Sequence, residues 1–437
     1  MIALPVFGQL PGGFGTGNSA YDGPSILGRG GPGTGNQGEE HVPIHVQASL
    51  NGTYDTNLLG FALDSNGGFQ PRASYGVEAF LNAAGRKLWR RSFVGLDYSG
   101  NYSRTWPQSL YSGTNHQLNL VYGTQIGSKV QILSQLATGT SNRFLGGPSV
   151  FQQSEFEFLT PPIGELFDSR SYYIGNTTSV IYSLSRRQSF RVSGTGAAIR
   201  RRARGLVDMA TYGASADWVY RASRRTSIGV SYSFSHFDFT KIFGDTDVHT
   251  IGMHMSRKMG RKLELIVAVT GSQQSTVGIR SFTLDPVLSA ILGRSTGSEV
   301  FESNNLLYGY NAGLNYRYRR SSASVTGGRG ITPGNGYFLT SISQFVNVSG
   351  TYNPSRDWTL GASAGFSRLE SLGFTSNPYK GWNAGLSTTY KLTESFGLNF
   401  RYDWRKYQLQ QTALNRNGHR VSAGITYFPK NGIAGLR

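Results

Sequence analysis

The chain has 437 residues, no cysteine and a formal net charge of +18 at pH 7. The lack of cysteine excludes disulfides and thiolate metal sites. No apolar run approaches the roughly 18 residues of a membrane-spanning helix, so any passage through a bilayer has to be made by strands. Charged residues make up only 15% of the chain, below the roughly 25% of ordinary soluble domains.

A strongly positive chain often binds nucleic acid. Here the basic residues are mostly Arg and lie in short clusters between strand patterns, without a basic helix. That distribution favours lipid-headgroup phosphates or an anion-attracting lumen. We therefore expect no nucleic-acid partner.

Residues 1–42 are rich in Gly, Pro, Ser and Asn and have no periodicity, which predicts a flexible leader. The first nine residues lack a positively charged stretch, so they are interpreted either as a mature N-terminus or as the end of a signal peptide. Gly12, Gly13, Gly15 and Gly17 imitate a phosphate-binding loop. No strand pattern precedes them and no helix pattern follows, which argues against that site.

From Pro43 onward, apolar and polar residues alternate with period two, as the two faces of a strand require. The alternation is clearest from Leu306 to Tyr318 and from Phe396 to Arg405. Such runs exceed the about 5–6 residues of most soluble strands and meet the about 9–11 residues of a tilted membrane strand. In chain order, the apolar faces of the expected strands begin at Ile44, Tyr75, Val94, Leu118, Val130, Tyr172, Phe190, Tyr212, Ile228, Ile251, Leu263, Leu306, Val325, Ile342, Trp358, Trp382, Phe396 and Val421.

The connections alternate between short and long. Short turns are expected at residues 85–87, 127–129, 185–187, 223–225, 260–262, 319–321, 353–356 and 393–395, and long connections at 141–170 and 273–305. Bacterial outer-membrane barrels have an even strand number, short periplasmic turns and longer extracellular loops. Because hydrocarbon cannot satisfy exposed backbone groups, such a sheet has to close. The sequence thus predicts an all-β transmembrane antiparallel barrel of about 18 strands, with 16 as the alternative, wide enough for an aqueous interior.

Over residues 43–428 the sequence resembles a Gram-negative outer-membrane β-barrel protein. Residues 421–428, Val-Ser-Ala-Gly-Ile-Thr-Tyr-Phe, are similar to the C-terminal strand that such proteins present to the barrel-assembly machinery, although a tail, 429–437, follows here. A Gly-rich leader, basic turns and no plug-like segment are similar to porins and to barrels associated with exopolysaccharide export. The resemblance implies an outer-membrane location, contact with membrane lipid and lipopolysaccharide, and the assembly machinery as a partner. A periplasmic polysaccharide-export protein is a further candidate partner.

The polar faces of two strands supply candidate pore-lining residues. They are Asn315, Arg317 and Arg319 in one strand and Asn399, Arg401, Asp403 and Arg405 in the other. One hypothesis is that the arginines bias the lumen towards anionic solutes or acidic polysaccharide. The alternative is that they pair with Asp and Glu across strands and stiffen the wall.

Two further groups are candidate sites in connections. The first long connection holds four acidic residues beside Phe and Pro: Glu155, Glu157, Glu165 and Asp168. This acidic group either folds inward as a constriction or remains part of a surface loop. A basic run on the outward side is either a clamp on lipopolysaccharide phosphates, which suit bidentate guanidinium groups, or a solvated loop: Arg200, Arg201, Arg202 and Arg204.

Histidines are few. A hairpin brings His236, Asp238, Asp247 and His249 near one another as metal ligands or an acid–base pair, or they are ordinary loop residues. His249 and His254 are five apart, which places them on opposite faces of a strand. Adjacent Ser235 and His236 also point apart, against a nucleophile–base pair. We expect no metal, no cofactor and no catalytic residue.

The sequence predicts a single-domain outer-membrane channel that passes polar or anionic solutes or an exported polysaccharide, and not an enzyme. One alternative is a structural or surface-interaction barrel without an open channel. A third is an outer-membrane hydrolase.

Overall fold

The computed structural model describes residues 45–63, 69–106, 112–141, 171–201, 207–240, 244–283, 295–332, 340–372, 378–409 and 415–427. The predicted leader, 1–42, and tail, 429–437, lie outside these ranges, as do Glu155, Glu157, Glu165, Asp168, Arg202 and Arg204. Among the described residues, no helix is long and apolar enough to span a membrane.

The described residues form 18 strands. They are β1 His45–Leu63, β2 Phe69–Leu88, β3 Ser92–Trp106, β4 Gly113–Ile126, β5 Val130–Ser141, β6 Ser171–Ser183, β7 Gln188–Arg201, β8 Met209–Arg221, β9 Thr226–Asp238, β10 Gly244–Met259, β11 Leu263–Thr283, β12 Thr296–Tyr318, β13 Ser321–Thr332, β14 Ser341–Tyr352, β15 Trp358–Ser371, β16 Tyr379–Lys391, β17 Phe396–Leu409 and β18 Asn415–Tyr427. Each strand is antiparallel to its neighbours, and the predicted all-β fold of 18 strands is confirmed.

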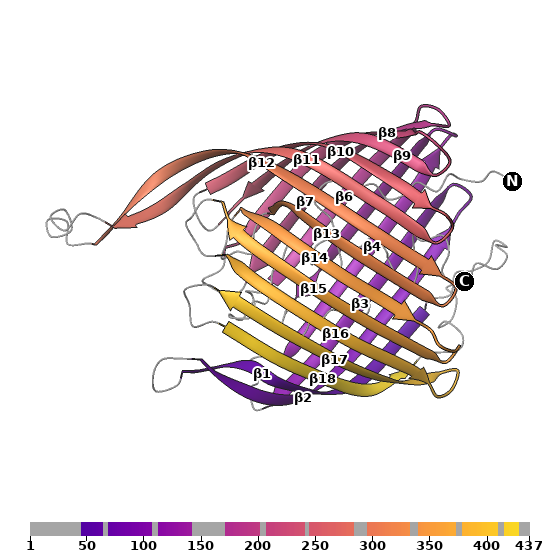
Figure 1. Cartoon of the computed structure of the whole chain (residues 1–437), viewed down its shortest axis with the longest axis vertical. Helices are drawn as coiled ribbons and strands as arrows, with labels where there is room; N and C mark the ends of the chain where they lie inside the picture. Colours follow the sequence, from indigo (N-terminus) through magenta and orange to yellow (C-terminus); the bar gives the residue numbers. More distant parts are fainter. Residues whose placement is uncertain are drawn as a thin grey trace.

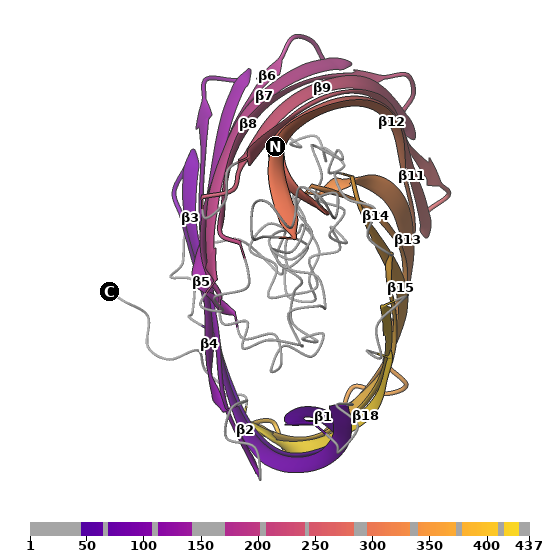
Figure 2. The ribbon, with the colours of Figure 1, turned by 90° about the vertical axis from the view of Figure 1, so that its left-hand side faces the viewer.

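The sheet closes because β1 pairs with β18 as well as with β2. At the closing pair Asn51 lies opposite Gly424. A Cβ at Gly424 would come within 2.1 Å of the Leu50 carbonyl oxygen, so glycine is what permits this close approach. Figure 2 shows the resulting ring, which is longer in one direction than in the other.

The connections separate the barrel into two ends. Short turns at residues 89–91, 127–129, 184–187, 222–225, 260–262, 319–320, 353–357 and 392–395 lie at one end, with the start of β1 and the end of β18. We call this end the turn rim, on the right in Figure 1, and the opposite end the loop rim. Gly127 and Gly260 adopt positive φ in two of the turns, where glycine meets no steric penalty.

Two expectations need correction. The turn predicted at 85–87 lies instead at 89–91, because Gly85 pairs with Leu96 inside the β2–β3 ladder. The long connection predicted at 273–305 is mostly strand: β11 continues to Thr283 and β12 starts at Thr296. Polar residues hid this ladder from the hydrophobic pattern, and the hairpin projects beyond the loop rim as a twisted ribbon (Figure 1).

The outward face is apolar around the ring. Large side chains there are solvent-exposed, with Met253 at 70% and Ile251 at 62% of full exposure. Soluble monomers rarely expose contiguous apolar patches larger than about 300–600 Å². Exposed aromatic residues gather next to the turn rim: Trp89, Tyr182, Phe190, Tyr318, Tyr352, Trp358, Tyr390, Phe396 and Tyr427. A band of apolar residues edged by aromatics is the outside of a membrane barrel.

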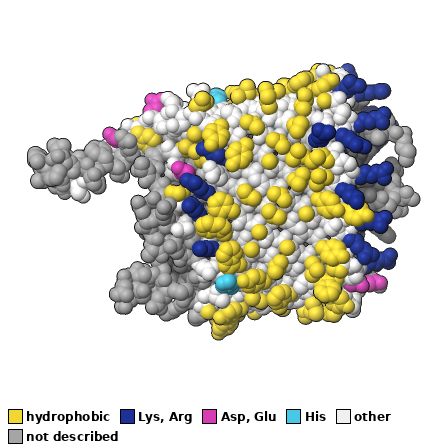
Figure 3. All heavy atoms as spheres, in the orientation of Figure 1, with side chains coloured by type: hydrophobic (Ala, Val, Ile, Leu, Met, Phe, Trp, Pro, Cys, Tyr) yellow, Lys and Arg dark blue, Asp and Glu magenta, His cyan; other side chains and the backbone are white. Residues whose placement is uncertain are grey.

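Exposed cations ring the turn rim and appear in dark blue on the right of Figure 3. Seven of the eight turns contain at least one, and Lys391 flanks the eighth. We call this set the basic collar: Lys87, Arg90, Arg91, Lys129, Arg186, Arg187, Arg224, Arg225, Arg257, Lys258, Arg261, Lys262, Arg317, Arg319, Arg320, Arg356 and Lys391.

Candidate pore

The inner wall is built from the polar half of each alternating strand. On β17 the outward residues include Leu398 and Phe400, both exposed and apolar. Asn399, Arg401, Asp403 and Arg405 alternate with them, so they face the interior as the sequence predicts. Their role in lining a conducting pore remains a prediction.

Arg401 and Asp403 are paired within β17. The guanidinium donates from Nε and from one terminal nitrogen to the two carboxylate oxygens, at 2.8 and 2.9 Å. Asp403 is buried, with 6% of its side chain exposed. Beside this pair, the Asn399 amide donates to Thr426 Oγ1 on β18 at 2.6 Å. These contacts fix the side chains against the wall.

A second pair spans the closing seam. Arg420 on β18 donates to Glu78 on β2, across the intervening strand β1. Both side chains are buried, at 10% and 5% exposure. Asp55 on β1 lies opposite Arg420 in the register and is also buried. The seam thus carries one cation with two carboxylates nearby, so these three groups together leave one negative charge.

The predicted residues on β12 divide between wall and rim. Asn315 alternates with outward Tyr316 and lies opposite Glu264 on β11. Arg317 lies on the same inner face of β12 as Asn315, next to the end of the strand at the turn rim, and it is exposed. Arg319 is in the β12–β13 turn with a φ of 33°, and its guanidinium lies over the Tyr318 ring at 5.8 Å. Arg317 and Arg319 therefore belong to the basic collar rather than to the middle of the barrel.

The middle of the described inner wall is nearly balanced in charge. Its inward acidic residues are Asp55, Glu78, Asp97, Asp217 and Asp403, and its inward basic residues are Arg191, Arg401, Arg405 and Arg420. Among the described residues, the surplus of positive charge is concentrated instead on the turn rim. This distribution favours the wall-stiffening interpretation of the β17 arginines over a positively biased middle of the lumen.

The opposite wall buries a titratable pair. Asp217 on β8 and His254 on β10 face inward, and their closest side-chain atoms, Oδ1 and Nδ1, are 3.8 Å apart. That separation is longer than a hydrogen bond. Arg191 on β7 lies opposite Asp217 in the register. Because His249 faces outward opposite Phe234, the sequence-based exclusion of a shared site with His254 holds.

An apolar cluster on the inner wall below the loop rim was missed from the sequence. Its buried core joins β7 to β10 with the end of β13: Ile199, Met209, Phe237, Phe239, Val248 and Ile331. Tyr173, Leu307 and Leu372 pack against it. We call these residues the loop-rim cluster. Next to it, Thr246 on β10 and Thr340 before β14 share a hydrogen bond of 2.7 Å between their hydroxyls.

The missed signal is an inversion of the alternation. Along β9 the outward positions change from Tyr232 and Phe234 to His236 and Asp238, and the apolar residue moves to inward Phe237. On β10, outward Asp245 and Asp247 flank Thr246 and precede inward Val248. A wall that is polar outside and apolar inside suits water outside, so this part of the wall extends past the apolar band.

The basic run at the end of β7 is split by its strand. Arg200 is exposed and alternates with inward residues, whereas Arg201 is buried. The Arg201 guanidinium donates to the Val207 carbonyl, and its backbone N–H donates to Asp208 Oδ1 at 2.6 Å. Arg201 therefore cannot contribute to a clamp on the outer surface, because its strand position turns it to the interior. Arg202, Arg204 and the acidic candidate constriction lie outside the described residues.

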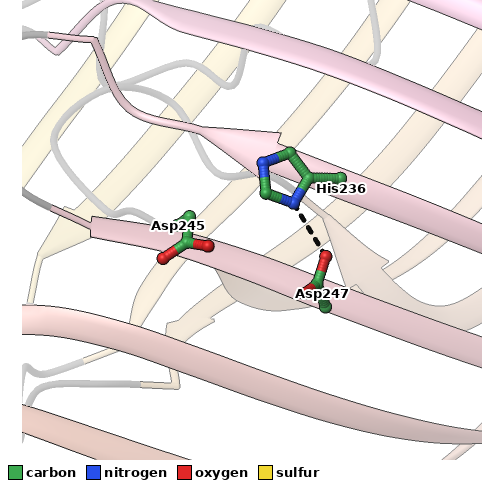
Figure 4. Close-up of side chains that lie close together, drawn as sticks. All are labelled: His236, Asp245 and Asp247. Carbon is green, nitrogen blue, oxygen red and sulfur yellow. Dashed lines mark hydrogen bonds and ion pairs between the residues drawn. The ribbon is translucent and has the colours of Figure 1, made fainter.

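Three ligand-type side chains meet on the outer surface near the loop rim. His236 Nδ1 and Asp247 Oδ1 are 2.7 Å apart, and with Asp245 they offer ligand atoms within 4.8 Å of one another. Figure 4 shows the two carboxylates beside the ring. His249, which the sequence pattern groups with His236 and Asp247, instead places its Nδ1 atom 2.9 Å from the Tyr232 hydroxyl. The His236–Asp247 hydrogen bond accounts for their proximity without an ion.

No family model matches the chain, and no curated protein matches it either. Solved structures with a similar outline include Pseudomonas aeruginosa OccK5 (OpdH), with 13% identity, a TM-score of 0.40, and coverage of 89% of this chain and 98% of that one. P. aeruginosa OccK2 (OpdF) in complex with glucuronate has 12% identity, a TM-score of 0.43, and coverage of 88% and 98%. A BenF-like porin from Pseudomonas fluorescens Pf-5 has 10% identity, a TM-score of 0.44, and coverage of 89% and 99%.

Proposed function

We propose that the chain is an outer-membrane channel for polar solutes. The observation that carries this proposal is the closed ring of 18 strands with exposed apolar residues outside and polar residues inside. A ring of this strand number is wide enough for an aqueous lumen. An exported polysaccharide as the solute, and a periplasmic export protein as a partner, remain predictions.

The limits of the apolar band support membrane insertion. Three outward tyrosines at the middle of their strands place their hydroxyls within hydrogen-bond distance of a histidine in the loop-rim half of the next strand: Tyr98–His116 at 2.8 Å, Tyr232–His249 at 2.9 Å and Tyr402–His419 at 2.7 Å. Amphipathic aromatic side chains favour the level of lipid headgroups. These pairs lie where the alternation inverts on β9 and β10, so we place one membrane boundary there.

Any anion preference should come from the turn-rim mouth. The middle of the described wall is nearly neutral, whereas the basic collar surrounds one entrance. Charge at a pore mouth raises the local concentration of counter-ions, and salt screens this effect over about 10 Å at 0.1 M. We therefore expect anion preference at low salt that weakens as salt rises.

A structural barrel without an open channel is the second candidate. The loop-rim cluster and the Thr246–Thr340 hydrogen bond favour it, because they bring the ends of β13 and β15 against the inner faces of β7 to β10. A hydrolase has less support, because Ser235 faces inward opposite Gly213 and His236 faces outward opposite Tyr212.

Planar-bilayer recording of the purified full-length chain separates the first two candidates. A channel gives discrete current steps that are proportional to voltage, whereas an occluded barrel leaves the bilayer silent. Reversal potentials across a KCl gradient then report the ion preference. Silence of protein that migrates as a folded barrel in unheated gels would refute the channel proposal.

A further inference from the structure

We propose that the basic collar binds the phosphodiester headgroups of anionic phospholipids in the membrane leaflet next to the turn rim. The proposal concerns the collar cations on the outside of the barrel, which leaves out inward Arg317, and it does not depend on whether the lumen conducts. Three observations support it: the level of the collar relative to the apolar band, the spread of its cations around the ring, and the small number of carboxylates beside them.

The depth of the collar matches a headgroup layer. Its cations lie directly beyond the exposed aromatic residues that edge the apolar band. Lys262 Nζ lies 3.5 Å from the centre of the Tyr318 ring, and Lys87 Nζ lies 5.5 Å from that of Trp89. Tyr and Trp settle at the membrane interface, so ammonium groups stacked on their rings are held at the depth of lipid phosphates.

The distribution of the collar is annular. Cations occur in seven of the eight turns, as adjacent pairs such as Arg186–Arg187 and Arg224–Arg225 in five of them. The visible edge of the turn rim in Figure 3 carries dark blue side chains along its whole length. A protein partner docks against one sector of a surface, whereas lipid surrounds a barrel completely. A ring of charge therefore fits lipid.

Counter-charge on this rim is sparse. Among its described residues, the exposed carboxylates are Asp357 and Glu394. The loop-rim half of the outer surface is different, since Asp238, Asp245, Asp247, Glu302 and Glu370 accompany its cations. Clustered cations beside a membrane attract anionic lipid, and guanidinium groups suit phosphate because they donate in a planar fork.

Quenching of tryptophan fluorescence by brominated lipids tests the proposal locally. Trp218 on β8 faces outward near the turn rim, between the turns that hold Arg187 and Arg225. Trp404 on β17 faces outward in the loop-rim half. Two single-tryptophan proteins, each with the other five tryptophans changed to Phe, are reconstituted in phosphatidylcholine with brominated phosphatidylcholine or brominated phosphatidylglycerol.

At low salt, we expect brominated phosphatidylglycerol to bind near Trp218 severalfold more strongly than brominated phosphatidylcholine. The ratio should fall towards one as salt rises, because exposed charges are screened. The variant R186Q/R187Q/R224Q/R225Q should lower the ratio at Trp218 and leave it unchanged at Trp404. The variant R186K/R187K/R224K/R225K keeps the charge and should retain most of the preference.

Equal quenching by the two lipids at Trp218 would overturn the proposal. This measurement uses a protein with an unmodified collar, so it does not depend on whether the charge variants fold. A preference that survives both high salt and the Gln variant would overturn it too. Binding of soluble polyglutamate to the collar, with no lipid preference, would assign the surface to an acidic protein instead. Conductance of the same preparations is measured separately, so loss of lipid preference and loss of channel activity remain distinguishable.

Discussion

Arg401 and Asp403 form a two-bonded ion pair on one strand, two residues apart, with the carboxylate buried against the barrel wall. The pair has no net charge, although the sequence places two more arginines nearby. This relationship decides how substitutions on β17 should affect ion passage through the proposed channel.

Changing Arg401→Gln alone should alter ion preference more than removing the whole pair. The single variant removes the cation that donates two hydrogen bonds to the Asp403 carboxylate, so reversal potentials should shift towards cations. The double variant R401Q/D403N removes both charges and should stay close to the unmodified protein. A larger shift in the double variant than in the single one would contradict the pairing.

The same single variant should also lose stability, because an unsatisfied buried acceptor costs about 1–3 kcal/mol. The double variant should recover part of that loss. Urea unfolding in lipid vesicles measures both. Arg368→Gln is the matched control, because Arg368 and Glu370 form a pair whose side chains are 36% and 46% exposed, and exposed pairs contribute about 0–1 kcal/mol.

Glu78→Gln should weaken the closing seam. Glu78 accepts from Arg420 across β1, and breaking a buried ion pair from one side costs about 3–5 kcal/mol. The variant should therefore change from its folded to its unfolded gel mobility at a lower temperature. Glu302→Gln, at an exposed position of β12, should leave that temperature unchanged. An equal effect of the two changes would mean that the seam pair has no special role.

A lysine on the outward face should be far more costly than one on the inward face. Val346 is 47% exposed on the apolar outside of β14, and its neighbour Asn347 points inward, opposite Thr326 and Gly365. Lys facing lipid near the bilayer midplane costs about 2–4 kcal/mol, so Val346→Lys should unfold at lower urea concentration than Asn347→Lys. The reverse order would invalidate the assignment of the two faces.

Phe237→Ala should loosen the loop rim without opening the rest of the barrel. Removing a buried Phe side chain costs about 3–5 kcal/mol, and Phe237 lies in the loop-rim cluster. We expect faster hydrogen exchange at the ends of β9 and β13, and noisier or larger single-channel currents. Phe234→Ala, three positions away on the outward face of β9 and opposite His249, should leave the currents unchanged.

Sequence alone determined the local features of this protein. Period-two alternation from Ile44 to Tyr427 and the spacing of Gly and basic residues were sufficient to predict about 18 strands and seven of the eight short turns, because side-chain direction in a strand depends only on position along it. Where polar residues replaced the pattern, as in the β11–β12 hairpin, the prediction placed a loop in a region that is strand.

The contacts between distant segments were decided by tertiary structure. Glu78 meets Arg420, 342 residues away, only because closure brings β18 beside β1 in one register. The loop-rim cluster gathers residues from β7 to β10 and β13. The inverted alternation of β9 and β10 is visible in the sequence. It can be interpreted only when the closed barrel defines which face of each strand is inside. The basic collar likewise follows from closure: seven of the eight turns contribute one or two cations each, and the ring places them all on one rim.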